Sequence, residues 1–147
     1  MFTGTLLIVV TATDAQEKIK ESVTQNKIVV LVFQDVHFEF NKSTLNKEAK
    51  DALKEDIAQI DDKTNIAMLV AGYTSAIGTE KYNQALSERR AESVKNFLVQ
   101  EKIFPADKIS SIGYGETKPA LYEVNPNDIH SKAAKANMRV LLKIIHK

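Results

Sequence analysis

One arginine lies where a predicted helix should be apolar. From Thr79 to about Gln100 the apolar side chains recur with helical spacing, and at ~100° per residue they form one stripe about 160° wide. Arg90 falls near the middle of that stripe. A guanidinium keeps its charge in a protein, so a buried one needs an anion, a group of carbonyl oxygens or a route to water. We therefore expect Arg90 to have a specific partner.

Two roles are open for Arg90. In the structural role, its side chain extends past Leu86 to solvent or pairs with a local acid such as Glu39. In the functional role, its guanidinium offers a bidentate fork to an incoming carboxylate. The glycine-bracketed loop 72–78 comes directly before the helix, and its backbone N–H groups and the helix N-terminus favour anion binding.

Residue types that serve other chemistry are scattered. His37, His130 and His146 share no helix-face spacing, so we expect no metal site and no cofactor. The sequence has no nucleophile elbow, no zinc-protease motif and no phosphate-binding loop that ends in Lys-Ser or Lys-Thr. The paired carboxylates Asp61 and Asp62 are typical of a turn. We therefore predict that the protein is not an enzyme.

Length and composition favour one soluble globular domain with an extra N-terminal segment. The chain has 147 residues, of which 44% are hydrophobic and 27% are charged, so a folded core is expected. Its formal charge of +1 provides no strong overall attraction to nucleic acid. The absence of cysteine excludes disulfides, thiolate metal sites and a cysteine nucleophile.

The first 30 residues are predicted to stand apart from the main domain. Their apolar run Leu6–Val10 is far shorter than the roughly 18 to 20 residues that cross a bilayer, so we expect no transmembrane segment in this chain. Met1 to Ala15 makes a poor signal peptide because it lacks a basic start. We predict a strand over 6–11 and a linker over 13–27, with the end of a preceding domain as one interpretation of residues 1–30.

The elements that position Arg90 follow from the pattern of residues 31–147, the predicted domain. Apolar runs or alternation predict strands over 28–33, 36–40, 66–71, 108–114 and 138–145. Helical spacing predicts helices over 45–60, capped by Ser43 or Thr44, and over 79–100, with a short Ala-rich helix before the last strand. The order β-α-β-α-β-(α)-β predicts an α/β, or α+β, sandwich: two main helices on a mixed sheet, with an extra N-terminal strand.

The segments around Arg90 also carry a recognisable pattern. The loop is Gly72-Tyr73-Thr74-Ser75-Ala76-Ile77-Gly78, and the helix contains Tyr82-Asn83-Gln84-Ala85-Leu86-Ser87-Glu88-Arg89-Arg90-Ala91. Further pieces follow in order: Phe38-Glu39-Phe40-Asn41, Gly113-Tyr114-Gly115-Glu116 with Pro119, and Asn137-Met138-Arg139-Val140. From about Val36 to Ile145 the chain therefore resembles the OmpA C-terminal-like domain, which is shared by peptidoglycan-associated lipoproteins and flagellar stator subunits.

The resemblance implies a non-catalytic cell-envelope module that binds peptidoglycan non-covalently. Family members grip the diaminopimelate of the stem peptide between an Asp of the loop and an Arg of the helix. Arg90 matches that Arg, but Ser75 stands at the Asp position. Because a hydroxyl brings no charge to an ammonium group, we expect binding weakened about five- to thirty-fold. Thr74, Asn41 and Arg139 are expected to complete the pocket.

Other departures from the family pattern also fall on the expected site. Tyr73 replaces a His, Met138 replaces the first Arg of an Asn-Arg-Arg-Val motif, and Ala133-Ala134 stand where Gly-Arg is usual. An alternative is therefore a structural or protein-interaction domain that kept the fold and lost peptidoglycan binding. Its partner would then be an envelope protein. The resemblance alone implies a periplasmic or outer-membrane-associated location.

Overall fold

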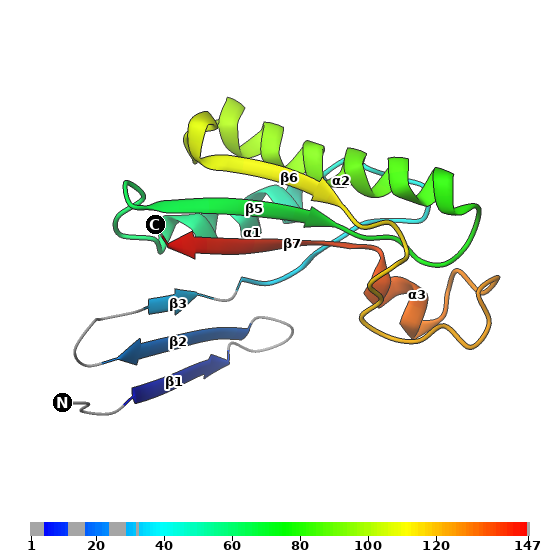
Figure 1. The fold of residues 1–147 in the computed structure, drawn as a ribbon, viewed down its shortest axis with the longest axis horizontal. Coiled ribbons are helices and arrows are strands. Elements are labelled where there is room, and N and C mark those ends of the chain that lie inside the picture. Colours follow the sequence, from blue (N-terminus) through cyan, green and yellow to red (C-terminus); the bar gives the residue numbers. More distant parts are fainter. Residues whose placement is uncertain (1–4, 12–16, 24–28, 32, 147) are drawn as a thin grey trace. The chain divides into compact units, whose positions relative to one another are not determined.

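The computed structural model describes residues 5–11, 17–23, 29–31 and 33–146 (Figure 1). The chain forms two compact units, Met1–Gln34 and Asp35–Lys147. In the first unit, β1 (Thr5–Thr11), β2 (Glu17–Val23) and β3 (Val29–Leu31) make an antiparallel sheet in the order β1-β2-β3. The strand predicted over 6–11 corresponds to β1.

The prediction of a linker over 13–27 is wrong for residues Glu17–Val23, which form β2. Its sequence, Glu-Lys-Ile-Lys-Glu-Ser-Val, is mostly charged or polar, and such residues are poor strand formers when taken alone. All seven β2 residues nevertheless pair with β1, from Glu17 opposite Thr11 to Val23 opposite Thr5. Pairing with an apolar neighbour strand thus overrides the low intrinsic propensity of this segment.

The second unit is built on a four-stranded mixed sheet in the order β4-β7-β5-β6. The strands are β4 (Val36–His37), β5 (Ile66–Gly72), β6 (Ile109–Gly113) and β7 (Arg139–His146). The C-terminal strand β7 is antiparallel to both β4 and β5, whereas β5 and β6 are parallel. This is the mixed α/β architecture that the sequence predicts.

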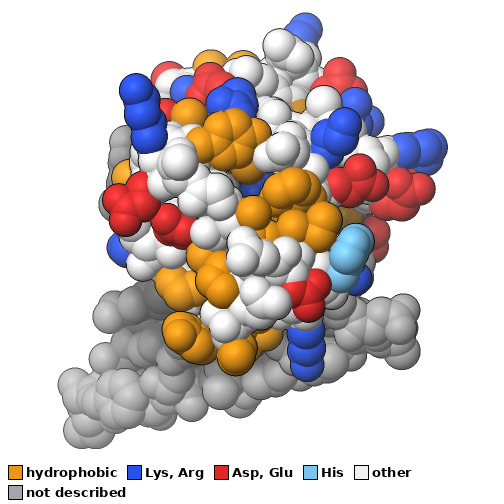
Figure 2. All heavy atoms as spheres, turned by 90° about the vertical axis from the view of Figure 1, so that its right-hand side faces the viewer, with side chains coloured by type: hydrophobic (Ala, Val, Ile, Leu, Met, Phe, Trp, Pro, Cys, Tyr) orange, Lys and Arg blue, Asp and Glu red, His pale blue; other side chains and the backbone are white. Residues whose placement is uncertain are grey.

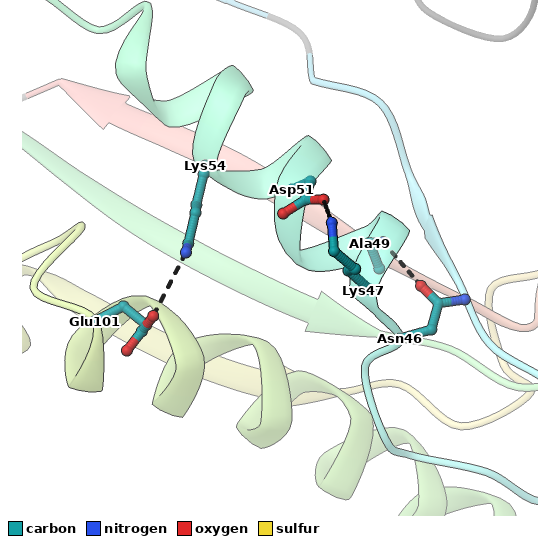
Figure 3. Close-up of polar contacts among 6 residues, drawn as sticks. All are labelled: Asn46, Lys47, Ala49, Asp51, Lys54 and Glu101. Atoms are coloured by element: carbon teal, nitrogen blue, oxygen red, sulfur yellow. Dashed lines mark hydrogen bonds and ion pairs between the residues drawn. The ribbon is translucent and has the colours of Figure 1, made fainter.

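Two long helices, α1 (Lys47–Ala58) and α2 (Glu80–Gln100), lie side by side on one face of this sheet (Figures 1 and 3). Lys54 of α1 is 3.5 Å from Glu101 at the end of α2, and the Phe97 ring lies near the ammonium groups of Lys50 and Lys54. A 3-10 turn, Ala106–Lys108, precedes β6, and the short α3 (Lys132–Asn137) precedes β7. The core between helices and sheet contains Leu53, Ile57, Met68, Val70, Val94, Leu98 and Val140.

Two glycines let α2 lie close against the sheet. A Cβ at Gly72 would overlap the carbonyl oxygen of Ser87, and one at Gly113 would meet the Ser87 hydroxyl and lie 2.6 Å from the backbone nitrogen of Glu88. The Ser87 hydroxyl instead accepts a hydrogen bond from the Gly115 N–H at 2.8 Å. This close approach fixes the distance between α2 and the ends of β5 and β6.

The two helix starts differ in how well the sequence predicts them. The helix predicted from Thr79 begins there, because Thr79 caps α2 and its hydroxyl accepts from the Tyr82 N–H at 3.1 Å. The cap predicted for α1 is wrong: Asn46, rather than Ser43 or Thr44, accepts from the Ala49 N–H at 2.8 Å (Figure 3). Asn is as good a cap as Ser, so the pattern alone could not choose among three candidates within four residues.

The strand predicted over 36–40 is shorter than expected. After His37 the Phe38 N–H still donates to the Met138 carbonyl at 2.9 Å, but the chain then turns, with the Lys42 N–H donating to the Glu39 carbonyl at 3.0 Å. Asn41 adopts the left-handed φ of 60° that such a turn requires. The turn 39–42 brings two backbone carbonyl groups over the N-terminal half of α2. Within the described ranges, neither α1 nor α2 is apolar enough over a sufficient length to cross a membrane.

Candidate functional site

Arg90 is fully enclosed by the fold, with 0% of its surface exposed. Its Nε donates to the Lys42 carbonyl at 2.8 Å, and its Nη2 donates to the Glu39 carbonyl at 3.0 Å. Its Nη1 donates to the carbonyl of Tyr73, directly after β5, at 3.0 Å. The guanidinium therefore joins α2 to the turn 39–42 and to the end of β5.

Backbone carbonyl groups are thus the partners of Arg90 inside the protein. The side chain neither extends to solvent nor pairs with the Glu39 carboxylate, because Glu39 contributes only its backbone oxygen. Within the described residues, Arg90 makes no ion pair with an acid. Burial lowers the pKa of Arg90 to about 10, which leaves the group cationic at neutral pH. Among the described residues, carbonyl dipoles and the face of the Phe38 ring, 5.3 Å from the guanidinium carbon, solvate this charge, and no carboxylate pairs with it.

A small pocket lies beside this cation. A guanidinium has five N–H donors, and the three hydrogen bonds to carbonyl groups leave two. Polar side chains and Arg90 share the pocket with four apolar ones: Asn41, Thr74, Ser75, Asn83, Phe40, Ile77, Leu86 and Met138. The cavity measures about 10 Å³, which is close to the space that one water molecule needs. A ligand carboxylate therefore enters only if a lining side chain moves.

Two hydroxyl groups of the loop after β5 line this pocket, and only one of them has a hydrogen-bond partner among the described residues. The Ser75 hydroxyl accepts from the Ile77 N–H at 3.1 Å, which closes a tight turn. The Thr74 backbone N–H donates to the Gly115 carbonyl at 2.9 Å, but its buried hydroxyl oxygen has no hydrogen-bond partner among the described residues. Because an unsatisfied buried hydroxyl is costly, Thr74 marks a place where a ligand or water is expected.

Two residues near the start of α2, Tyr82 and Asn83, also make side-chain hydrogen bonds near this pocket. Tyr82 donates its hydroxyl to the side-chain oxygen of Asn41 at 2.6 Å, which ties the turn 39–42 to the first turn of α2. The Asn83 amide donates to Glu116 at 3.4 Å and is 2% exposed. Asn83 precedes Arg90 by seven residues, two helical turns, so the helix pattern contained the signal that places both on one face.

Four of the five predicted site residues come together: Asn41, Thr74, Ser75 and Arg90 line the same pocket. Arg139 does not line it. Its guanidinium lies 3.9 Å from the centre of the Tyr73 ring, and its Nε is 3.9 Å from the Asp35 carboxylate. Tyr73 follows Gly72, whose α-carbon faces α2, so alternation along the strand turns Tyr73 and Arg139 to the opposite face of the sheet.

A second, larger cavity adjoins the Arg90 pocket. It measures about 580 Å³ and shares Phe40 and Met138 with the smaller pocket. Its remaining lining residues are His37, Phe38, Glu39, Lys42, Thr44, Leu45, Asn46, Ile129, His130 and Lys135. The loops after β5 and β6 and helix α3 gather at this end of the second unit, where hydrophobic side chains are surrounded by charged ones (Figures 1 and 2).

Comparison with known proteins identifies the family. The model of the OmpA family matches residues 37–133, well over half of the chain. The chain is a member of the OmpA family. It is 48% identical to outer membrane protein A of Escherichia fergusonii over 87 residues, and this aligned length covers 58% of this chain and 35% of that protein. It is 49% identical to outer membrane protein A of Serratia marcescens over 84 residues, and this aligned length covers 56% of this chain and 23% of that protein.

Solved structures share the fold of this OmpA-family domain. The peptidoglycan-associated lipoprotein of Burkholderia pseudomallei aligns with a TM-score of 0.65 at 24% identity, over 76% of this chain and 89% of that chain. The OmpA-like domain of FopA1 from Francisella tularensis aligns with a TM-score of 0.63 at 24% identity, over 97% and 81%. The C-terminal domain of Helicobacter pylori MotB gives 0.59 at 25% identity, over 76% and 85%. The predicted family and fold are therefore confirmed.

Proposed function

We propose that this domain is a non-catalytic cell-envelope module that binds peptidoglycan without a covalent bond, through the diaminopimelate of the stem peptide. One observation carries the proposal: Arg90 is a fully buried cation that bonds only to carbonyl groups and has no acidic partner among the described residues. A ligand carboxylate supplies the missing negative charge. Among the structural relatives, one carries the name peptidoglycan-associated lipoprotein.

The geometry supports a carboxylate at Arg90 in a specific way. The two remaining guanidinium N–H groups can donate to carboxylate oxygens, and charge-assisted bonds of this kind are about twice as strong as neutral ones. Phe40, which is 37% exposed, stands between the small pocket and the larger cavity. Movement of this side chain joins the two spaces and admits a ligand.

The other predicted site residues support Arg90 in different roles. Thr74 and Ser75 bring hydroxyl groups to the pocket, and Asn41 brings an amide from its mouth. Arg139 acts from the far face as a positioning residue: it packs on Tyr73, whose carbonyl accepts from Arg90. The backbone carbonyl of Arg139 also accepts from the Tyr73 N–H at 2.9 Å.

The cellular setting belongs to the same proposal. The curated relatives are named outer membrane protein A, and the chain spans about a quarter to a third of the length of those compared above. We propose that the domain is periplasmic or outer-membrane associated, where it holds an envelope assembly to the cell wall.

A binding assay with purified sacculi tests the proposal. The wild-type chain is expected to be retained by sacculi, and both Arg90→Ala and Arg90→Lys are expected to reduce retention about ten-fold or more, because neither can offer the fork. Arg89→Ala is the matched control, since Arg89 is the exposed neighbour on the same helix. Retention that is equal in wild type and the Arg90 variants, with all chains folded, contradicts the proposal.

One observation favours a second function, a protein-interaction domain that kept the fold and lost the ligand. Ser75 brings no charge to the pocket, and the cavity beside Arg90 is closed to about the size of one water molecule. Ser75→Asp separates the two functions. If only the variant binds sacculi, the wild type has lost the ligand, whereas retention of the wild type excludes this second function.

A further inference from the structure

Glu123 is a buried acid on a loop whose neighbouring large side chains face solvent. It lies in the segment between β6 and α3 and is 7% exposed, whereas Leu121, Tyr122 and Val124 are 43%, 83% and 88% exposed. The opposite arrangement is expected from transfer free energies, because apolar groups gain and carboxylates lose on leaving water. Burial of this carboxylate therefore needs hydrogen-bond donors to compensate for its lost hydration.

The Glu123 carboxylate is fixed beside the loop after β5 that helps to line the Arg90 pocket. Its Oε1 accepts from the Ala76 backbone N–H at 3.1 Å and from the Asn137 amide at 2.8 Å. Ala76 lies between Ser75 and Ile77, two residues that line the pocket. Asn137 itself accepts from the backbone N–H groups of Ala120 and Leu121, so the loop and α3 hold the carboxylate together.

Within the described residues, the other carboxylate oxygen of Glu123 has no hydrogen-bond partner. Oε2 is enclosed and accepts no hydrogen bond in the described part of the chain, and no Lys or Arg there lies in ion-pair range of Glu123. The unpartnered hydroxyl of Thr74 belongs to the same loop that Glu123 contacts. A buried carboxylate oxygen without a donor is unfavourable, and a donor that arrives with the ligand removes that penalty.

We propose that Glu123 receives the ammonium group of the ligand whose carboxylate binds Arg90. The site then selects a zwitterionic amino-acid head group over a plain carboxylate. The negative charge comes from Glu123 in the loop before α3, because Ser75 carries none. This inference rests on the proposed function, because it places the ligand carboxylate at Arg90. In an amino acid both charged groups are attached to the same carbon, so one head group can present its carboxylate to Arg90 and its ammonium group to Glu123.

A pair of ligands and one isosteric variant test this role. Binding of meso-diaminopimelate and of pimelate, the same diacid without its amino groups, is measured by calorimetry on the full chain. In Glu123→Gln, the bonds to Ala76 and Asn137 hold the amide oxygen at the Oε1 position, which turns the amide NH₂ toward the ligand ammonium. We expect affinity for meso-diaminopimelate to fall about ten-fold and affinity for pimelate to change less than about two-fold.

Glu80→Gln is the matched control, because it removes an exposed acid in the first turn of α2 that lines neither cavity. An equal loss for both ligands in Glu123→Gln, or no loss for either, overturns the role of Glu123. Equal wild-type affinity for both ligands also overturns it and leaves the proposed function intact, whereas wild type that binds neither overturns both. The side-chain carboxyl ¹³C resonance of wild-type Glu123 gives a readout that does not depend on a variant: it should shift with meso-diaminopimelate and stay fixed with pimelate.

Discussion

At the scale of the residue, Arg90 has a structural and a proposed binding role at the same time. Its three carbonyl partners hold the turn 39–42 and the end of β5 against α2. Loss of the guanidinium would leave these oxygens buried with fewer donors, at roughly 1–3 kcal/mol for each unsatisfied group. Arg90→Ala therefore perturbs stability as well as binding, and the sacculus assay needs a folding check on every variant.

The effect of Ser75→Asp on affinity for meso-diaminopimelate is expected to depend on the charge of residue 123. Asp can accept from the Ile77 N–H as Ser75 does, so the turn is preserved while a carboxylate enters the pocket. In Glu123→Gln, we expect Ser75→Asp to restore the lost affinity for meso-diaminopimelate. In the wild type, we expect a gain of only about three-fold, because two nearby carboxylates repel each other. Calorimetry on the four chains measures this coupling, and a full additive gain in both backgrounds contradicts it.

The sequence predicts a pocket residue where the pattern of a single helix is enough to place it. The apolar stripe of α2 located Arg90, and the Thr79 cap fixed where that helix begins. The carbonyl partners could not be predicted, because they depend on a turn at 39–42 that interrupts an apparently regular alternation. Glu123 was also out of reach: nothing in the residues around it shows that its side chain lies inside and those of its neighbours outside.

At the scale of the element, the site depends on the close packing of α2 against β5. Gly72→Ala places a methyl group on the Ser87 carbonyl, so we expect α2 to be displaced and stability to fall by about 3 kcal/mol. Urea unfolding measures the change. Gly78→Ala is the control, because its nearest atoms are 3.8 Å from an added Cβ and only its φ of +97° opposes the substitution, at about 1 kcal/mol. A Gly72→Ala loss no larger than that of the control contradicts this packing account.

At the scale of the whole molecule, the proposed activity belongs to the second unit alone. All residues that line the two cavities lie in Asp35–Lys147, as do Arg139 and Glu123. The predicted boundary between residues 30 and 31 stays a prediction, and the two compact units divide at Gln34 and Asp35. Deletion of residues 1–34 is expected to change affinity for meso-diaminopimelate by less than about two-fold. A larger loss, with the shortened chain still folded, assigns the first unit a part in binding.

The central claim is that the buried guanidinium of Arg90 accepts a carboxylate from outside the protein. The most direct measurement follows the side-chain ¹⁵N resonances of Arg90 while meso-diaminopimelate is added to the wild-type chain. We predict a saturable shift of these resonances, with the same midpoint as the binding isotherm from calorimetry. Resonances of Arg90 that stay unchanged while the ligand saturates the protein would contradict the claim.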